Sequence, residues 1–234
     1  RDLFATNLDC PLPCFAGLEA GKSTLEDIDN VINGLDYNGV IAGQLNAGEN
    51  NHFSLKFRQP GLLSVDISTE NEVLQRIRIG LTEPNIWLSK NIFDVPNVIN
   101  DLGVPDNVFI LFHGPPLRFT TALLYNREGA LLIYRSEFYQ QDIEPDQPLS
   151  LCYSREKADL YQIDVWLQNP EGNDLVEDNQ PDLRDAEREN RPFWPLEKVA
   201  GIDEAAFAQL FIDDPDSCIE ALSSNELREQ GYVF

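Results

Sequence analysis

The chain has 234 residues, of which 42% are hydrophobic and 10% aromatic, so it is long and apolar enough to fold around its own core and is not an intrinsically disordered protein. It carries 40 acidic and 17 basic residues, a net charge of −23, and such a field repels phosphate backbones and anionic membrane surfaces. We therefore expect no nucleic-acid partner, and no apolar run approaches the roughly 18 residues of a membrane-spanning segment.

Two of the four cysteines lie close together in Cys10-Pro-Leu-Pro-Cys14. The prolines favour an extended or polyproline segment, in which residues four apart are on the order of 12 Å from each other. Because a disulfide needs Cα atoms within about 7 Å, we expect this pair to bridge to Cys152 and Cys218, in an order that the sequence leaves open. The alternative is four free thiols in a cytosolic protein.

The next eight residues, Ala16-Gly-Leu-Glu-Ala-Gly-Lys-Ser23, fit the looser phosphate-loop pattern that allows alanine first. A working phosphate loop follows directly on a buried strand, whereas a proline-rich segment precedes this one. We therefore interpret these residues as a turn before a helix, with Ser23 and Glu26 as a capping box. A nucleotide-binding enzyme that uses residues 16–23 as its phosphate loop stays an alternative.

An internal repeat follows. Residues 27–35 return as residues 94–102, at an offset of 67, with six of nine positions identical. Both copies place apolar residues at helical spacing, and Asp94 is a suitable N-cap for the second. Such a repeat is typical of a structural unit that packs against a copy of itself. The two apolar stripes are Leu25, Ile28, Val31, Ile32 and Leu35, and Val95, Val98, Ile99 and Leu102.

Strand-like segments divided by turn residues follow each predicted helix. They are expected near residues 40–42, 52–58, 62–68 and 73–81, then 108–112, 118–125, 130–136 and 149–153, with one more at 161–167. This order predicts an α+β fold: two tandem units of a short helix plus a four-stranded antiparallel meander, with a C-terminal extension containing an acidic loop and a helix. We place the units at residues 1–88 and 89–155 and the extension at 156–234.

One sheet face of the first unit is predicted to be basic. In the second strand, apolar and polar residues alternate, which predicts one buried face and one open face. The alternation brings His52, Lys56 and Arg58 to the open face, where we expect Arg76 and Arg78 to join them. Such a stripe could steer an acidic partner protein onto the sheet. The alternative is pairing across strands with Asp66, Glu70 and Glu72.

No constellation of catalytic or metal-binding residues stands out. The only histidines are His52 and His113, neither of them at a metal-ligand spacing from a cysteine. We expect no cofactor, no metal and no enzymatic activity. An acid-rich segment could hold calcium, but it lacks the ligand spacing and the glycine of a calcium loop, so a solvated loop is preferred. Its acids are Glu171, Asp174, Glu177, Asp178, Asp182, Asp185, Glu187 and Glu189.

The glycine turn of residues 17–23, its capped helix and the helix end Leu102-Gly-Val-Pro105 together resemble a known pattern. The chain resembles the superfamily of β-lactamase-inhibitor-protein-like domains and small outer-membrane assembly lipoproteins, in which a tandem duplication is the inhibitor-like arrangement. The cysteine pattern, which ends in Asp214-Pro-Asp-x-Cys218, is similar to that of uncharacterised secreted or lipoprotein-like proteins of green non-sulfur bacteria.

The resemblance implies a bacterial envelope or extracellular protein that binds other proteins through a sheet face. We therefore expect a non-enzymatic, extracytoplasmic interaction module, secreted or anchored to the surface through a segment upstream of Arg1. Its partner would be another protein. Self-assembly as a structural subunit of a cell-surface filament or layer is the alternative, which the acidic surface and the disulfides would also suit.

Overall fold

A computed structural model gives the fold. It describes residues 10–34, 40–47, 50–57, 62–82, 93–113, 118–137, 144–153, 159–171 and 193–231, and for all of strand β1 and part of strands β2, β3, β7 and β9 it describes the backbone alone. The expected acidic loop beyond Glu171, the basic residue Arg58 and Leu35 of the first apolar stripe lie outside the described residues.

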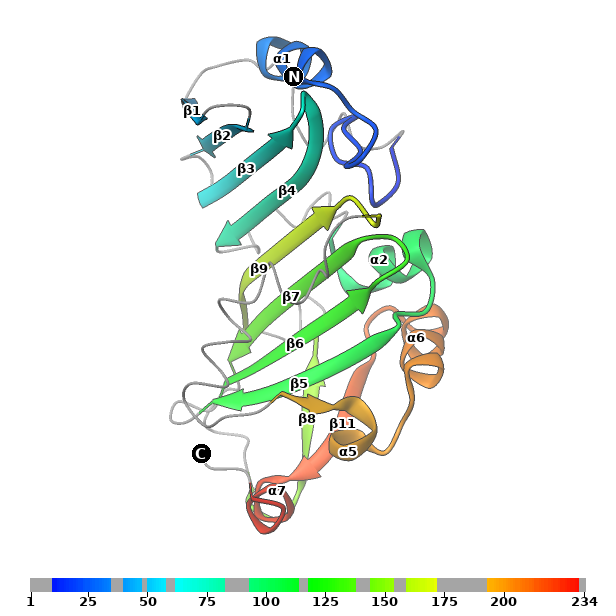
Figure 1. The fold of residues 1–234 in the computed structure, drawn as a ribbon. Coiled ribbons are helices and arrows are strands. Elements are labelled where there is room, and N and C mark those ends of the chain that lie inside the picture. The colour runs from blue at the N-terminus through cyan, green and yellow to red at the C-terminus, as the bar shows by residue number, and fades with distance from the viewer. Residues whose placement is uncertain are drawn as a thin grey trace.

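The architecture is mixed helix and sheet with mostly antiparallel strands, which confirms the α+β part of the predicted fold class. Nine strands form one sheet in the order β1-β2-β3-β4-β9-β7-β6-β5-β10, and β8 and β11 pair separately (Figure 1). The strands are β1 Val40–Ala47, β2 Asn50–Phe57, β3 Leu62–Glu70, β4 Val73–Thr82, β5 Asn107–His113, β6 Arg118–Tyr125, β7 Ala130–Glu137, β8 Pro148–Cys152, β9 Asp159–Gln168, β10 Trp194–Pro195 and β11 Cys218–Ser223. The described helices are α1 Leu25–Gly34, α2 Val95–Leu102, α5 Leu196–Ala200, α6 Glu204–Asp213 and α7 Ser224–Glu229.

The main core lies on one face of the nine-stranded sheet. Side chains of β4, β6, β7 and β9 on this face are fully buried, in the same cluster as Ile28 of α1, Val98 of α2, Phe207 of α6 and Leu151 of β8. The helices and the β8–β11 pair therefore cover this face. The opposite face of the sheet is polar over β2, β3 and β4 and apolar over β6, β7 and β9. On the apolar part, a second buried cluster is formed by Ala122, Leu124, Leu131, Ile133 and Trp166.

Helix capping was predicted correctly for α2 and one residue out of place for α1. The Asp94 side chain accepts a hydrogen bond from the Asn97 N–H at the start of α2. In α1 the capping pair is Thr24 and Asp27, with the Thr24 N–H donating to the Asp27 carboxylate at 2.8 Å. This hydrogen bond holds the pKa of Asp27 below its usual range. Ser23, the predicted cap, instead accepts from the Glu19 N–H at 2.9 Å.

The expected strand near residues 149–153 exists as β8, but it does not continue the second meander. It pairs with β11, and the place beside β7 is taken by β9, which also pairs with β4. β9 is thus the strand that joins the N-terminal and C-terminal parts of the sheet. Its sequence Ile163-Asp-Val-Trp-Leu167 is apolar on both faces except at Asp164, as a central strand requires.

All four cysteines form disulfides, but the predicted long-range pairing is wrong. Cys10 bridges Cys14, with Cα atoms 5.5 Å apart, and Cys152 bridges Cys218. The proline-rich segment is not extended: it closes as a turn around a cis Leu12–Pro13 bond, with the Cys14 N–H donating to the Pro11 carbonyl. The second bridge joins residues that lie directly opposite each other in the β8–β11 pair.

Candidate functional site

The polar face of β2, β3 and β4 is the most open part of the described sheet. Apolar side chains of these strands, among them Phe53, Val65 and Ile77, point into the core. The alternate residues are half-buried or exposed, and most of them are small and polar. We call this surface the open face; its described members are His52, Ser54, Ser64, Asp66, Ser68, Arg76, Arg78, Gly80 and Thr82.

The structure brings the described members of the predicted basic stripe to this face, and two of them lie beside carboxylates. The His52 Nε2 atom is 3.9 Å from an Asp66 carboxylate oxygen, and a nitrogen of the Arg78 guanidinium is 3.7 Å from Asp164. Arg76 lies two residues before Arg78 and engages a further partner of its own. The side chain of Lys56 and the whole of Arg58 lie outside the described residues.

Asp164 is the centre of a charged cluster that sequence reasoning missed. Its side chain is only 3% exposed, and one carboxylate oxygen accepts hydrogen bonds from the Arg135 guanidinium and, at 2.7 Å, from the Gln162 amide. The other oxygen faces Arg78 of β4. The cluster therefore ties β9 to both of its neighbours, β4 and β7. The signal in the sequence was one aspartate in an otherwise apolar strand, which is uncommon without a buried partner.

Gly80 makes room for this cluster. It lies opposite both Ser64 and Asp164 in the sheet register, and a Cβ atom there would lie 2.8 Å from the Ser64 hydroxyl oxygen and 3.4 Å from a carboxylate oxygen of Asp164. A glycine inside a strand often marks such a close approach. The carboxylate can therefore reach toward β4 and meet Arg78 at the edge of the open face.

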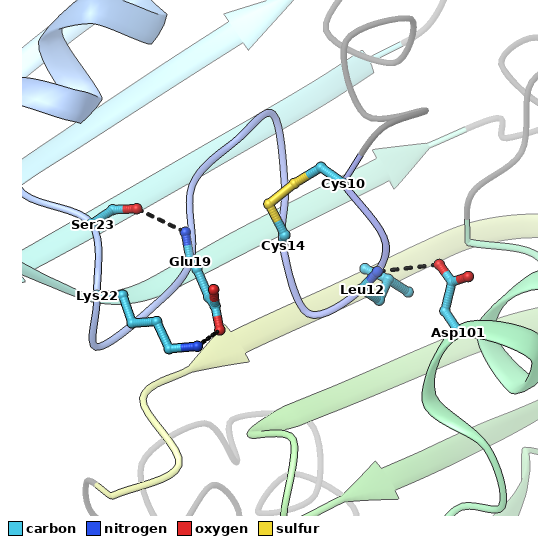
Figure 2. Close-up of a disulfide and its surroundings, with 7 residues drawn as sticks. All are labelled: Cys10, Leu12, Cys14, Glu19, Lys22, Ser23 and Asp101. Carbon is cyan, nitrogen blue, oxygen red and sulfur yellow. Dashed lines mark hydrogen bonds and ion pairs between the residues drawn. A yellow bond between two sulfur atoms is a disulfide. The ribbon is translucent and has the colours of Figure 1, made fainter.

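The phosphate-loop-like residues 16–23 form a tight turn docked on β4, and the Leu12 N–H before the turn donates to the Asp101 carboxylate of α2 (Figure 2). The Gly21 N–H donates to the Leu74 carbonyl at 2.6 Å, and the N–H groups of Lys22 and Ser23 donate to the Glu19 carbonyl. The Lys22 ammonium lies 2.5 Å from the Glu19 carboxylate. A phosphate loop needs such amides and such a lysine directed at the ligand, so this hydrogen bonding disfavours a phosphate site.

The cleft beside this turn is also poorly suited to phosphate. It has a volume of about 380 Å³ and lies between the turn, the β6–β7 connection and the end of β9. Its walls carry the carboxylates of Glu19, Glu128 and Glu171 against the cations Lys22 and Arg127. A polyanion would meet repulsion there, because acids outnumber bases in the wall.

Other candidate chemistry finds no support among the described residues. That part of the chain contains no group of three or more His, Cys, Asp and Glu side chains arranged to hold a metal ion. His113 contacts the Thr120 hydroxyl at 2.8 Å on the far half of the sheet. Of the acids considered for calcium, only Glu171 is described. None of the described helices is long and apolar enough to cross a bilayer.

Comparison of the chain with models of protein families, with curated proteins and with solved structures finds no match. The resemblance to inhibitor-like and assembly-lipoprotein domains therefore stays a prediction. What the site offers is a half-exposed, polar sheet face with one arginine held beside a buried carboxylate at its margin. Such a surface has the chemistry of a recognition site, because it carries donors, acceptors and small side chains.

Proposed function

We propose that this chain is a non-enzymatic, extracytoplasmic protein-binding module and that the open face is its binding surface. The observation that supports this most directly is the asymmetry of the sheet. One face of β2–β4 packs on the main core, while the other presents serines, a threonine, a glycine and charged side chains to solvent. A protein partner can be received on such a face without a deep pocket.

The two disulfides support the extracytoplasmic part of the proposal. Disulfides form and persist in oxidising compartments and are rare in the cytosol. Both bridges are local, since Cys10–Cys14 closes a turn and Cys152–Cys218 joins neighbouring strands. The strongly acidic composition suits a protein that must stay soluble at high concentration outside the cell.

We further propose that the sheet is built from two copies of one unit. Counted inward from its two edges, leaving out the short β10, the sheet reads β1-β2-β3-β4 and β5-β6-β7-β9. The helices α1 and α2 precede β1 and β5, and the repeated sequence falls on these two helices. An approximate two-fold axis between the antiparallel β4 and β9 would relate the copies, with β8 diverted to pair with β11.

Photo-crosslinking in the native host tests the binding surface. A photoreactive amino acid replaces Ser54 or Ser64 on the open face and, as a control, the exposed Gln209 on α6. We expect one defined protein to be captured from both open-face positions and not from Gln209. Capture of that protein should weaken as salt rises if charge contributes to binding. Equal capture from all three positions, or none from the open face, would contradict the proposal.

A further inference from the structure

Arg78 differs from the other basic residues described on the open face. Its guanidinium lies 5.3 Å from the centre of the Trp166 ring and 3.7 Å from the Asp164 carboxylate, and its side chain is 44% exposed. Trp166 itself is buried and lies directly opposite Arg78 in the β4–β9 register. The arginine is therefore held on a rigid base while its outer edge faces solvent.

The donors of this guanidinium are largely unused. An arginine carries five N–H donors in a planar fork. Among the described residues, no hydrogen bond uses the N–H groups of Arg78, and its contacts are the ion pair with Asp164 and the stacking on Trp166. A side chain that is already fixed loses little conformational entropy when a ligand binds, which favours binding at this point.

The charge around Arg78 is balanced within a strongly acidic protein, so an acidic ligand meets less repulsion here than the net charge suggests. Asp164 neutralises only one of its two arginine neighbours, because it is shared between Arg78 and Arg135. The other described charges on this side of β2–β4 are His52, Asp66, Arg76, which has a further partner of its own, and the exposed Glu70, two residues beyond Ser68. With His52 neutral, three arginines (Arg76, Arg78 and Arg135) face three carboxylates (Asp66, Glu70 and Asp164), so this region is balanced in charge although the whole chain has a net charge of −23.

We propose that Arg78, stacked on Trp166, is the anchor of the open face and binds a carboxylate of an acidic segment of the partner protein. This inference rests on the proposed function and names the chemistry of the partner. A guanidinium fork matches a carboxylate with two parallel hydrogen bonds, which a lysine does not reproduce. Arginine and tryptophan are also the residues most enriched among those that dominate binding energy at protein interfaces.

A defined peptide tests the anchor directly. Acetyl-hexaglutamate amide is titrated into the protein at 150 mM salt, where the Debye length of about 8 Å screens long-range repulsion. NMR follows the Trp166 indole N–H and the Arg78 Nε–H. We expect saturable shifts of both signals in the wild type, no binding with Arg78→Gln, and affinity at least about threefold lower with Arg78→Lys, which keeps the charge without the fork. Hexalysine should cause no such shifts.

The chain offers a matched control in Lys198, whose ammonium lies 5.1 Å from the centre of the Trp194 ring. Lys198→Gln also removes a cation stacked on a tryptophan, but outside the open face, so the hexaglutamate affinity should not change. Thermal unfolding checks that each variant is folded. The inference is wrong if the wild type shows no shifts, if Arg78→Lys binds like the wild type, or if Lys198→Gln weakens binding as much as Arg78→Gln.

Crosslinking from Ser64 in the Arg78→Lys background separates this inference from the proposed function. If the partner is captured as well as in the wild type, Arg78 is not the anchor but the open face still binds. If the open face captures nothing in the wild type, the proposed function fails, while the peptide titration still decides whether Arg78 binds carboxylates.

Discussion

Asp164 is a residue whose charge is expected to matter for stability. Asp164→Asn removes the buried carboxylate charge that pairs with the Arg135 guanidinium, which is only 14% exposed. Breaking a buried pair in this way costs about 3 kcal/mol of unfolding free energy. Asp66→Asn is the matched control, because the His52–Asp66 pair lies on the surface and should contribute less than about 1 kcal/mol. Urea unfolding of both variants measures the difference, and equal costs would contradict a buried, structural role for Asp164.

The raised pKa of Asp94 predicts that the stability of the fold depends on pH. Burial raises its pKa to about 6, although the hydrogen bond from Asn97 opposes the shift. The folded state therefore binds a proton that the unfolded state lacks between about pH 4 and pH 6, so this group stabilises the fold fully at low pH and loses that contribution as pH rises through 6.

Asp94→Asn should remove this contribution while keeping a good N-cap. Across the window from pH 4 to pH 6, the unfolding free energy of the wild type should fall relative to that of the variant, by up to about 1.36 kcal/mol per pH unit. Asp203→Asn makes the same change at the N-cap of α6 and measures what the substitution itself costs. A constant difference between wild type and Asp94→Asn across this window would show that the carboxyl is not perturbed.

At the scale of elements, the two disulfides should differ in their effects. In the chain-entropy model the stabilisation grows with the length of the closed loop. It is about 2 kcal/mol when the bridged cysteines are only a few residues apart and about 4 kcal/mol when they are several tens of residues apart. The bridged cysteines are 4 residues apart in Cys10–Cys14 and 66 apart in Cys152–Cys218. Replacing Cys152 and Cys218 by alanine should therefore lower the denaturation midpoint more than replacing Cys10 and Cys14. The reverse order would contradict this account of the bridges.

Most elements were predictable because they depend on local patterns. The alternating segments became strands within a few residues of their expected bounds, and the described members of the apolar stripes lie on the core-facing sides of α1 and α2. The errors arose where local rules compete. Thr24 and Asp27 form the capping pair because Ser23 is engaged by Glu19, and the proline-rich cysteine segment closes as a turn, an outcome open to prolines as much as an extended chain.

At the scale of the whole molecule, the sequence did not predict which strands would be neighbours. β8 and β9 were both expected as strands, but their partners are set by contacts far apart in the chain, such as the Cys152–Cys218 bridge and the Asp164 cluster. In the candidate site, too, the features set by local sequence were predictable and those set by distant residues were not. Alternation along β2 and β4 predicted the open face, whereas Trp166 and Asp164, which fix Arg78, come from the distant β9.

The account depends most on an oxidised, extracytoplasmic chain with two local bridges. Peptide mapping by mass spectrometry without reduction, on protein isolated from its native host, tests this directly. The account predicts one bridge between Cys10 and Cys14 and one between Cys152 and Cys218, each close to fully formed. Free thiols would contradict the extracytoplasmic location and reopen the question of a phosphate loop at residues 16–23. Bridges from the N-terminal pair to Cys152 and Cys218 would contradict the fold itself.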